Sequence, residues 1–167
     1  MTGLVELPLP ADTERLGRAI GALLRAGDVV VLAGPLGAGK TVLAKGIGAG
    51  LGVRGPITSP TFVIAREHPP LAEGNGVPMV HVDAYRLGGL AELDDLDLDT
   101  DLLAAAVVVE WGEGMAERLA DEHLLVRLRR GTAETSGAAE TRIAELHGPG
   151  RLLPEMACPP KRDGRAP

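Results

Sequence analysis

The sequence predicts an α/β fold, a three-layer sandwich around a mostly parallel central sheet with antiparallel additions. Val29–Ala33 and Ala106–Val109 are unbroken apolar runs, which are typical of strands buried on both faces of a parallel sheet. A glycine-rich turn and a helix over about Lys40–Leu51 follow the first run. Leu124–Arg130 alternates apolar with charged residues and could pair with Arg142–Leu146 as a hairpin. Buried strands that alternate with helices indicate helical layers packed on a sheet.

The N-terminal region predicts one extended segment and one helix. Gly3–Leu7 is extended and ends at Pro8, because proline breaks regular structure. Asp12 or Thr13 can cap the helix that follows, and Gly27 can end it in a left-handed conformation. The apolar residues of this helix recur at helical spacing: Leu16, Ala19, Ile20, Leu23 and Leu24.

The middle of the chain alternates less regularly. We expect strands over Thr61–Arg66 and Met79–Tyr85, separated by a loop over Glu67–Pro78, which contains prolines and glycines. Short helical turns are expected within the acidic stretch Gly88–Leu103, and a short helix over Met115–Ala120.

One domain is expected over residues 1–147, followed by a disordered tail over residues 148–167. The chain has 167 residues, of which 45% are hydrophobic, and this is enough apolar material for one core. The tail contains several prolines and ends in the polar segment KRDGRAP, without apolar periodicity. These features predict that the tail does not contribute to the core.

Composition excludes several classes of protein. A net charge of −6 argues against a dedicated binder of phosphate backbones, and 2% aromatic residues argue against a stacking platform, so no direct specific nucleic-acid binding is expected. No apolar run approaches the roughly 18 residues of a membrane-spanning helix. The N-terminus lacks the pattern of a signal peptide, and Cys158 is the only cysteine, which together favour a reduced, cytoplasmic compartment.

A phosphate-binding loop is the clearest functional motif. Gly34–Thr41 matches G-x-x-x-x-G-K-[ST] at every fixed position and lies between a predicted strand and a predicted helix, so a fold of the P-loop NTPase type is expected. Gly37 and Gly39 let the backbone bend and aim N–H groups at phosphate. Lys40 can reach the β- and γ-phosphates, and the Thr41 hydroxyl can bind Mg²⁺. The predicted ATP-binding residues are Gly37, Ala38, Gly39, Lys40, Thr41 and Val42.

Such a loop needs an acidic residue for Mg²⁺ or for the attacking water. Two candidates, Asp83 and Glu110, directly follow predicted strands. The carboxyl ends of strands in α/β sheets face the ligand crevice, so both side chains are expected there. We therefore predict that Lys40, Glu110 and Asp83 act in catalysis and that Thr41 and Glu110 hold the metal.

The motifs together resemble one family. In chain order they are Gly37–Thr41, Ser59–Phe62, the H-x-D-x-Y-R segment His81–Arg86, and Glu110–Trp111. Their order and spacing resemble the TsaE family, small bacterial P-loop ATPases of tRNA threonylcarbamoyladenosine synthesis, over about residues 4–130. The resemblance implies that the chain binds ATP and hydrolyses it slowly alone. It also implies that the chain supports the TsaB–TsaD pair, which modifies the adenosine beside the tRNA anticodon, so that tRNA is met only through that complex.

The resemblance also assigns roles to single residues. It implies that Lys40 holds phosphate, that Thr41 and Glu110 match the Mg²⁺ positions, and that Asp83 matches the acidic residue of the third motif. Ser59 and Thr61 lie in a segment similar to a nucleotide-sensing switch.

Two positions depart from the family pattern. Pro35 stands where the family usually has Asp, early in the loop and away from the phosphate cradle. Val42 stands where a second Thr is usual, so one hydroxyl is lost while the backbone N–H stays. A neutral hydrogen bond contributes about 1 kcal/mol, so the expected loss of nucleotide affinity is several-fold.

Two other functions stay open at this stage, a small-molecule kinase of the P-loop class and a nucleotide-dependent scaffold without turnover. A kinase usually needs an arginine-rich lid, but the stretch between Asp83 and Glu110 is acidic and holds Arg86 alone. The same shortage of arginine predicts hydrolysis that is slow alone and faster with a partner. The expected contacts to that partner are Ser59–Phe62 and Tyr85–Asp101.

Three weaker signals favour ordinary structural roles. The aspartates of Glu92–Asp101 alternate as in a calcium loop, but Thr100 and Ala106 stand where that loop needs Gly and Glu, so a solvated or partner-facing surface is expected. His81 is expected to be a packed, hydrogen-bonded histidine rather than a metal ligand. The pair Arg129–Arg130 ends a predicted strand, where a solvated position is the default.

Overall fold

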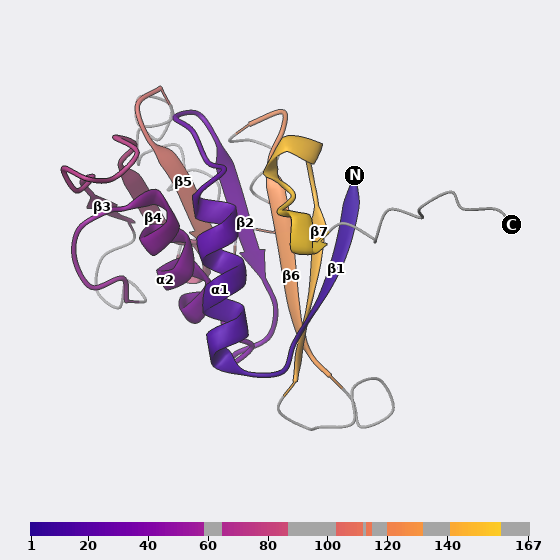
Figure 1. The fold of residues 1–167 in the computed structure, drawn as a ribbon. Helices are drawn as coiled ribbons and strands as arrows, with labels where there is room; N and C mark the ends of the chain where they lie inside the picture. The colour runs from indigo at the N-terminus through magenta and orange to yellow at the C-terminus, as the bar shows by residue number, and fades with distance from the viewer. Residues whose placement is uncertain (59–64, 87–102, 112, 115–119, 132–140, 158–167) are drawn as a thin grey trace, which may run out of the picture.

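The computed structural model describes residues 1–58, 65–86, 103–111, 113–114, 120–131 and 141–157. Its strands form one seven-stranded sheet with the order β1-β7-β6-β2-β5-β4-β3 (Figure 1). The strands are β1 (Thr2–Leu7), β2 (Val29–Ala33), β3 (Ala65–His68), β4 (Met79–Asp83), β5 (Ala106–Glu110), β6 (Leu124–Arg130) and β7 (Arg142–His147).

The centre of the sheet is parallel and its edges are antiparallel. β6, β2, β5 and β4 pair in parallel, whereas β7, β1 and β3 pair antiparallel with their neighbours. This confirms the predicted α/β class, the antiparallel additions and the hairpin of β6 with β7. Because the central strands share one direction, their carboxyl ends meet at one edge, where Ala33 and Glu110 lie.

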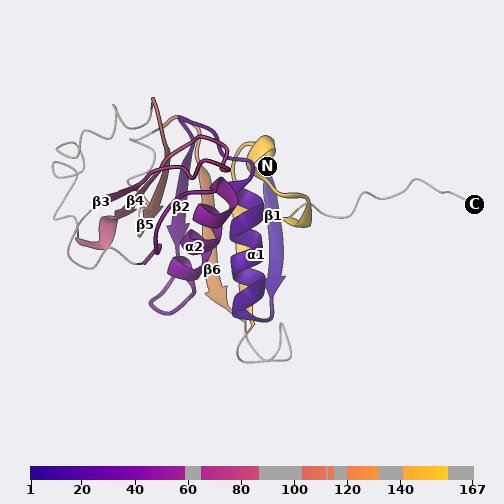
Figure 2. The same cartoon turned by 60° about the vertical axis from the view of Figure 1, so that its left-hand side comes forward.

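The helices α1 (Pro10–Gly21) and α2 (Lys40–Leu51) lie side by side on one face of the sheet (Figures 1 and 2). Their leucine and isoleucine side chains pack on the strands to form the larger core. Glycines let the helices approach closely, since a Cβ on Gly46 would lie 2.3 Å from the carbonyl oxygen of Glu14. No helix among the described residues is long and apolar enough to cross a membrane.

The other face of the sheet is buried as well. Val29 and Val31 of β2 and Val107 and Val109 of β5 are fully buried on this face, which explains why their strands lack polar alternation. The segments predicted to be helical at 88–103 and 115–120 lie almost wholly outside the described residues, so their helices stay predictions.

Helix α1 differs from its predicted bounds. It begins at Pro10, ahead of the predicted caps, because proline suits the first helical position and the Asp12 carboxylate accepts a hydrogen bond from Leu9 N at 3.0 Å. It ends at Gly21, earlier than predicted. Gly27 does adopt a left-handed φ of 93°, but within the turn that precedes β2.

Strands β3 and β4 also differ from prediction. The predicted strand Thr61–Arg66 lies mostly outside the described residues, and β3 extends to His68, into the predicted loop. As an edge strand it is held by backbone pairing with β4 and needs no apolar pattern. β4 ends at Asp83, two residues early, because the Asp83 carboxylate accepts a hydrogen bond from Tyr85 N at 3.1 Å and turns the chain.

The first part of the predicted tail is folded. Residues 150–152 and 155–157 form 3-10 turns, and Leu152 and Ala157 are each only 1% exposed. Arg151 Nη1 donates to the buried Asp28 carboxylate at 2.9 Å, which fastens this segment to the start of β2. The prediction of disorder from residue 148 is therefore wrong for residues 148–157, and residues 158–167 lie outside the described part.

Candidate nucleotide site

The loop between β2 and α2 has the backbone that its glycines predict. Gly34, Gly37 and Gly39 have φ values of 141°, 75° and 105°, and a Cβ on Gly34 would lie 2.3 Å from the carbonyl oxygen of Leu128. Since α2 begins at Lys40, the N–H groups of its first turn have no acceptor within the helix. The loop can therefore present several backbone donors and a helix N-terminus to an anion.

The Lys40 ammonium lies in the middle of this loop and is largely buried. Its Nζ donates to the carbonyl oxygens of Gly34 and Pro35 at 2.8 and 2.9 Å and lies 3.6 Å from the centre of the Trp111 ring. Burial lowers the pKa of Lys40, while the negative charges of Glu110 and Asp83 oppose that shift. The cation is thus held by weak dipolar and ring contacts, which a phosphate oxygen could replace.

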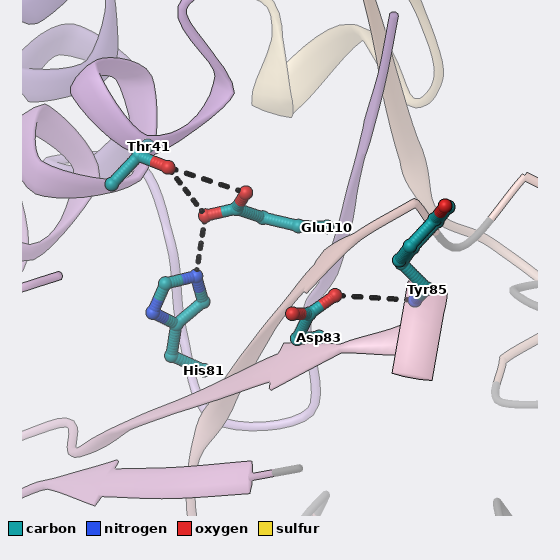
Figure 3. A network of polar contacts seen from close by, with 5 residues as sticks. All are labelled: Thr41, His81, Asp83, Tyr85 and Glu110. Carbon is teal, nitrogen blue, oxygen red and sulfur yellow. Dashed lines mark hydrogen bonds and ion pairs between the residues drawn. The ribbon is translucent and has the colours of Figure 1, made fainter. Parts of the chain in front are cut away.

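Glu110 ends β5 and faces the first turn of α2. Its two carboxylate oxygens each lie 3.4 Å from Thr41 Oγ1, and Oε1 accepts a hydrogen bond from His81 Nε2 at 2.9 Å (Figure 3). Glu110 is 3% exposed and His81 is fully buried. The carboxylate is therefore fixed from one side by His81 and directed at Thr41 from the other.

The spacing between Thr41 and Glu110 suits a small divalent cation. Their 3.4 Å separation exceeds the roughly 2.7–2.8 Å of a good hydroxyl–carboxylate hydrogen bond. It also lies between the roughly 3.0 Å that separates neighbouring oxygens around octahedral Mg²⁺ and the roughly 4.2 Å that separates opposite ones, so a small shift of either side chain lets both oxygens contact one cation. The described residues contain no cluster of three or more His, Cys, Asp or Glu suited to a metal. Mg²⁺ fits such a site, because it is usually held by one or two carboxylates together with substrate phosphates.

Asp83 lies beside Glu110 at the end of the neighbouring strand, since the two residues are paired in the β4–β5 register. It is 6% exposed and its carboxylate binds the backbone of Tyr85 (Figure 3). Its negative charge acts on Lys40. Asp83 thus contributes charge to the site and shapes the turn after β4.

Trp111 occupies a strained backbone position next to Glu110. Its φ of 63° is the one left-handed value among the described residues other than glycine, and its N–H donates to the carbonyl oxygen of Leu32 at 2.9 Å. This conformation places the indole against Lys40, while the ring of Tyr85 lies 5.2 Å from it. Trp111 therefore contacts the cation of the site directly, in addition to packing against Tyr85.

The structure brings together most of the predicted site. Lys40, Thr41 and Glu110 line one cavity of about 320 Å³, and Asp83 adjoins them. The predicted switch Ser59–Phe62 lies outside the described residues. His81 is a packed, hydrogen-bonded histidine as predicted, but its bond to Glu110 was not foreseen, because only the pairing of β4 with β5 brings the two together.

The strand, loop and helix of this site, set in a parallel sheet, define a protein of the P-loop class. The model of one family, described as threonylcarbamoyl adenosine biosynthesis protein TsaE, matches residues 7–139. The chain belongs to the TsaE family, and its role is in tRNA threonylcarbamoyladenosine biosynthesis.

Individual relatives agree with the family match. The chain is 57% identical to the TsaE protein of Streptomyces coelicolor over 136 residues, covering 81% of this chain and 89% of that protein. It is 59% identical to the Mycobacterium tuberculosis TsaE over 148 residues, covering 85% and 84% of the two chains. The crystal structure of YdiB from Bacillus subtilis is similar, with a TM-score of 0.68 and 28% identity over 92% of this chain and 89% of that one.

Proposed function

We propose that this chain binds Mg²⁺-ATP at Gly37–Val42, hydrolyses it slowly alone, and supports a TsaB–TsaD pair in the threonylcarbamoylation of tRNA. The observation that carries the proposal is that Lys40, Thr41 and Glu110 line one cavity together with Gly37 and Gly39, at the N-terminus of α2. The acidic net charge of −6 supports contact with tRNA through partners rather than directly. The single cysteine supports a reduced, cytoplasmic setting.

Lys40 and the loop backbone would bind the phosphates. The Nζ exchanges its two carbonyl contacts for charged phosphate oxygens, to which an ammonium binds more strongly. The N–H groups of the first turn of α2 then donate to the same phosphates. Binding thus uses groups that are already in place.

Thr41 and Glu110 would hold Mg²⁺, which when bound neutralises part of the charge on the triphosphate. His81 donates to Glu110 Oε1 and keeps the carboxylate turned toward Thr41. The other Glu110 oxygen stays directed at the loop, where it can accept a hydrogen bond from an attacking water. Asp83 maintains negative charge at the same edge of the sheet.

A Glu110→Gln variant tests this function, because it keeps the shape of the side chain and removes its charge. We expect ATP to bind while phosphate release falls at least about tenfold, both alone and with the TsaB–TsaD pair. Glu145→Gln, the same change at a residue paired with Arg129 away from the loop, should leave release unchanged. Unchanged release by Glu110→Gln would contradict the assignment.

Phosphate release with and without the partner pair tests the supporting role. A group supplied by a partner can raise hydrolysis about 10³–10⁵-fold, and we expect a clear increase in the complex. Tyr85, which is 74% exposed, is a described member of the predicted contact surface. Fast turnover by the isolated chain would contradict partner dependence, and no turnover in either state would favour the nucleotide-dependent scaffold.

A further inference from the structure

Two buried histidines, His81 and His68, each have one ring nitrogen without a hydrogen-bond partner among the described residues. In His81 this atom is Nδ1, which lies on the side of the ring away from Glu110 (Figure 3). In His68 it is Nε2, and the two residues are 0% and 4% exposed. Native proteins satisfy nearly all buried polar atoms, with protein groups or with ordered water. Each of the two nitrogens therefore indicates a further contact.

The strand register makes the two histidines neighbours. In the β3–β4 ladder, Arg66 pairs with His81 and His68 pairs with Met79. His68 and His81 are thus diagonal neighbours on one face of the sheet, the face on which Met79 joins the larger core under α1 and α2. Diagonal neighbours lie about 7–8 Å apart, within reach of aromatic side chains. The two unpartnered nitrogens therefore belong to adjacent rings that do not bond each other directly.

The proton of the His68 ring can be assigned from its other contact. Nδ1 lies 3.1 Å from the carbonyl oxygen of Arg54 and must donate to it, because a carbonyl only accepts. Burial lowers the pKa of His68, the hydrogen bond to Arg54 opposes that shift, and the charges of His81 and Arg66 add to it. The ring is therefore neutral near neutral pH, and its Nε2 is an acceptor.

We propose that one buried water bridges His81 Nδ1 and His68 Nε2 and makes His68 a positioning residue for Glu110. This inference rests on the proposed role of Glu110 in holding Mg²⁺. The water can donate to His68 Nε2, and it can either donate to His81 Nδ1 or accept from it. Buried waters usually make about two to four hydrogen bonds, so these two contacts are sufficient to hold one.

The bridge would fix the ring that orients Glu110. A ring held only at Nε2 can turn about its χ2 bond, whereas a ring held at both nitrogens cannot, as in histidines oriented by a second hydrogen bond in metal sites. The contacts then run from Glu110 through His81 and His68 to Arg54, whose N–H donates to the carbonyl oxygen of Pro69 at 2.8 Å. Arg54 belongs to the connection after α2, which leads in the sequence to the predicted switch Ser59–Phe62.

A high-resolution crystal structure of the full chain tests the bridge directly. We expect one ordered water within about 3.2 Å of both His81 Nδ1 and His68 Nε2. The same water should be lost in a crystal of His68→Phe, because phenylalanine offers it neither a donor nor an acceptor. A site without water, or a water bonded to only one of the two rings, would overturn the inference.

Phosphate release by His68→Phe tests the positioning role, because this variant keeps a buried ring and removes the contact. We expect release, alone and with the TsaB–TsaD pair, to fall at least about threefold, while ATP affinity stays within about twofold. His147→Phe is the matched control. His147 also has a buried ring nitrogen without a partner among the described residues, but it lies in β7, which β6, β2 and β5 separate from β4. Its substitution should leave release unchanged.

A double-mutant cycle separates positioning from packing. Because His68 acts on Glu110 only through His81, adding His68→Phe to His81→Phe should lower release by less than about 1.5-fold. A loss of the same size in both backgrounds would overturn the positioning role, since His68 would then support packing alone. Absence of release by the wild type, alone and with its partners, would instead overturn the proposed function, and the crystal structure would still decide whether the bridge exists.

Discussion

His81 supports Glu110, the acidic residue whose carboxylate contacts Thr41 of the loop. Its Nε2 donates to Glu110, and its buried Nδ1 has no hydrogen-bond partner among the described residues. A carboxylate oxygen accepts, so Nε2 is the donor in this contact. His81 is therefore a positioning residue, because it acts through Glu110.

A pair of variants tests this role. His81→Phe keeps a buried ring and removes the donor, and we expect phosphate release to fall about tenfold, as for other partners of metal-binding residues. ATP affinity should stay within twofold, because the loop is untouched. His81→Gln, which can still donate to Glu110, should recover part of the activity. Equal loss in both variants would mean that His81 serves packing alone.

At the scale of elements, the contact between α1 and α2 positions the loop. Gly17 and Gly21 of α1 face Gly46 and Gly50 of α2, and a Cβ at any of them would lie 2.1–2.4 Å from a backbone oxygen of the other helix. Backbone cannot move aside as a side chain can. The backbones of α1 and α2 therefore lie so close together that only glycine fits between them. This contact fixes the position of α2, and with it the position of the loop residues at its start.

Gly46→Ala is expected to destabilise the fold. Overpacking typically costs about 1–3 kcal/mol, and here it opposes a helix-propensity gain of about 1 kcal/mol. We predict a net loss of about 1 kcal/mol or more in urea unfolding. The exposed neighbour Lys45 offers a control, since Lys45→Ala should stay within about 0.5 kcal/mol of the wild type. A Gly46→Ala protein as stable as the wild type would show that the helices can separate freely.

The C-terminal segment contributes to stability although its sequence predicts disorder. Leu152 and Leu153 are 1% and 7% exposed, and Arg151 pairs with the buried Asp28. Truncation after residue 147 should remove these contacts and cost about 3 kcal/mol or more in the free energy of unfolding. Truncation after residue 157 should cost little, because it keeps them. The measurement is thermal or urea unfolding of the two truncated chains, and equal stability would contradict the packing role.

For the whole molecule, local signals predicted the elements and the loop. The bounds of α2 agree with the prediction, because Gly52 ends the helix in a left-handed conformation with φ 74°. The strands β2 and β5 were also predicted from local sequence, because an unbroken run of valines is typical of a strand buried on both faces of a parallel sheet.

The remaining features depend on the order of strands and on contacts between distant segments. Nothing local links His81 to Glu110, or Arg130 to Gly37, because each pair meets only through the sheet. The prolines near residue 150 suggested disorder, but they border short turns whose leucines are buried against the core. The sequence motifs predict which residues are functional, and the order of strands in the sheet determines which of these residues are in contact.

Calorimetric titration with Mg²⁺-ATP tests the central claim most directly, through Lys40→Ala and the matched control Lys45→Ala. Lys40 provides the buried cation of the loop, whereas Lys45 is exposed on the same helix. We predict one binding site in the wild type and in Lys45→Ala, and an affinity at least about 30-fold lower in Lys40→Ala, equivalent to about 2 kcal/mol. Equal affinity in all three proteins would contradict the assignment of the phosphate site.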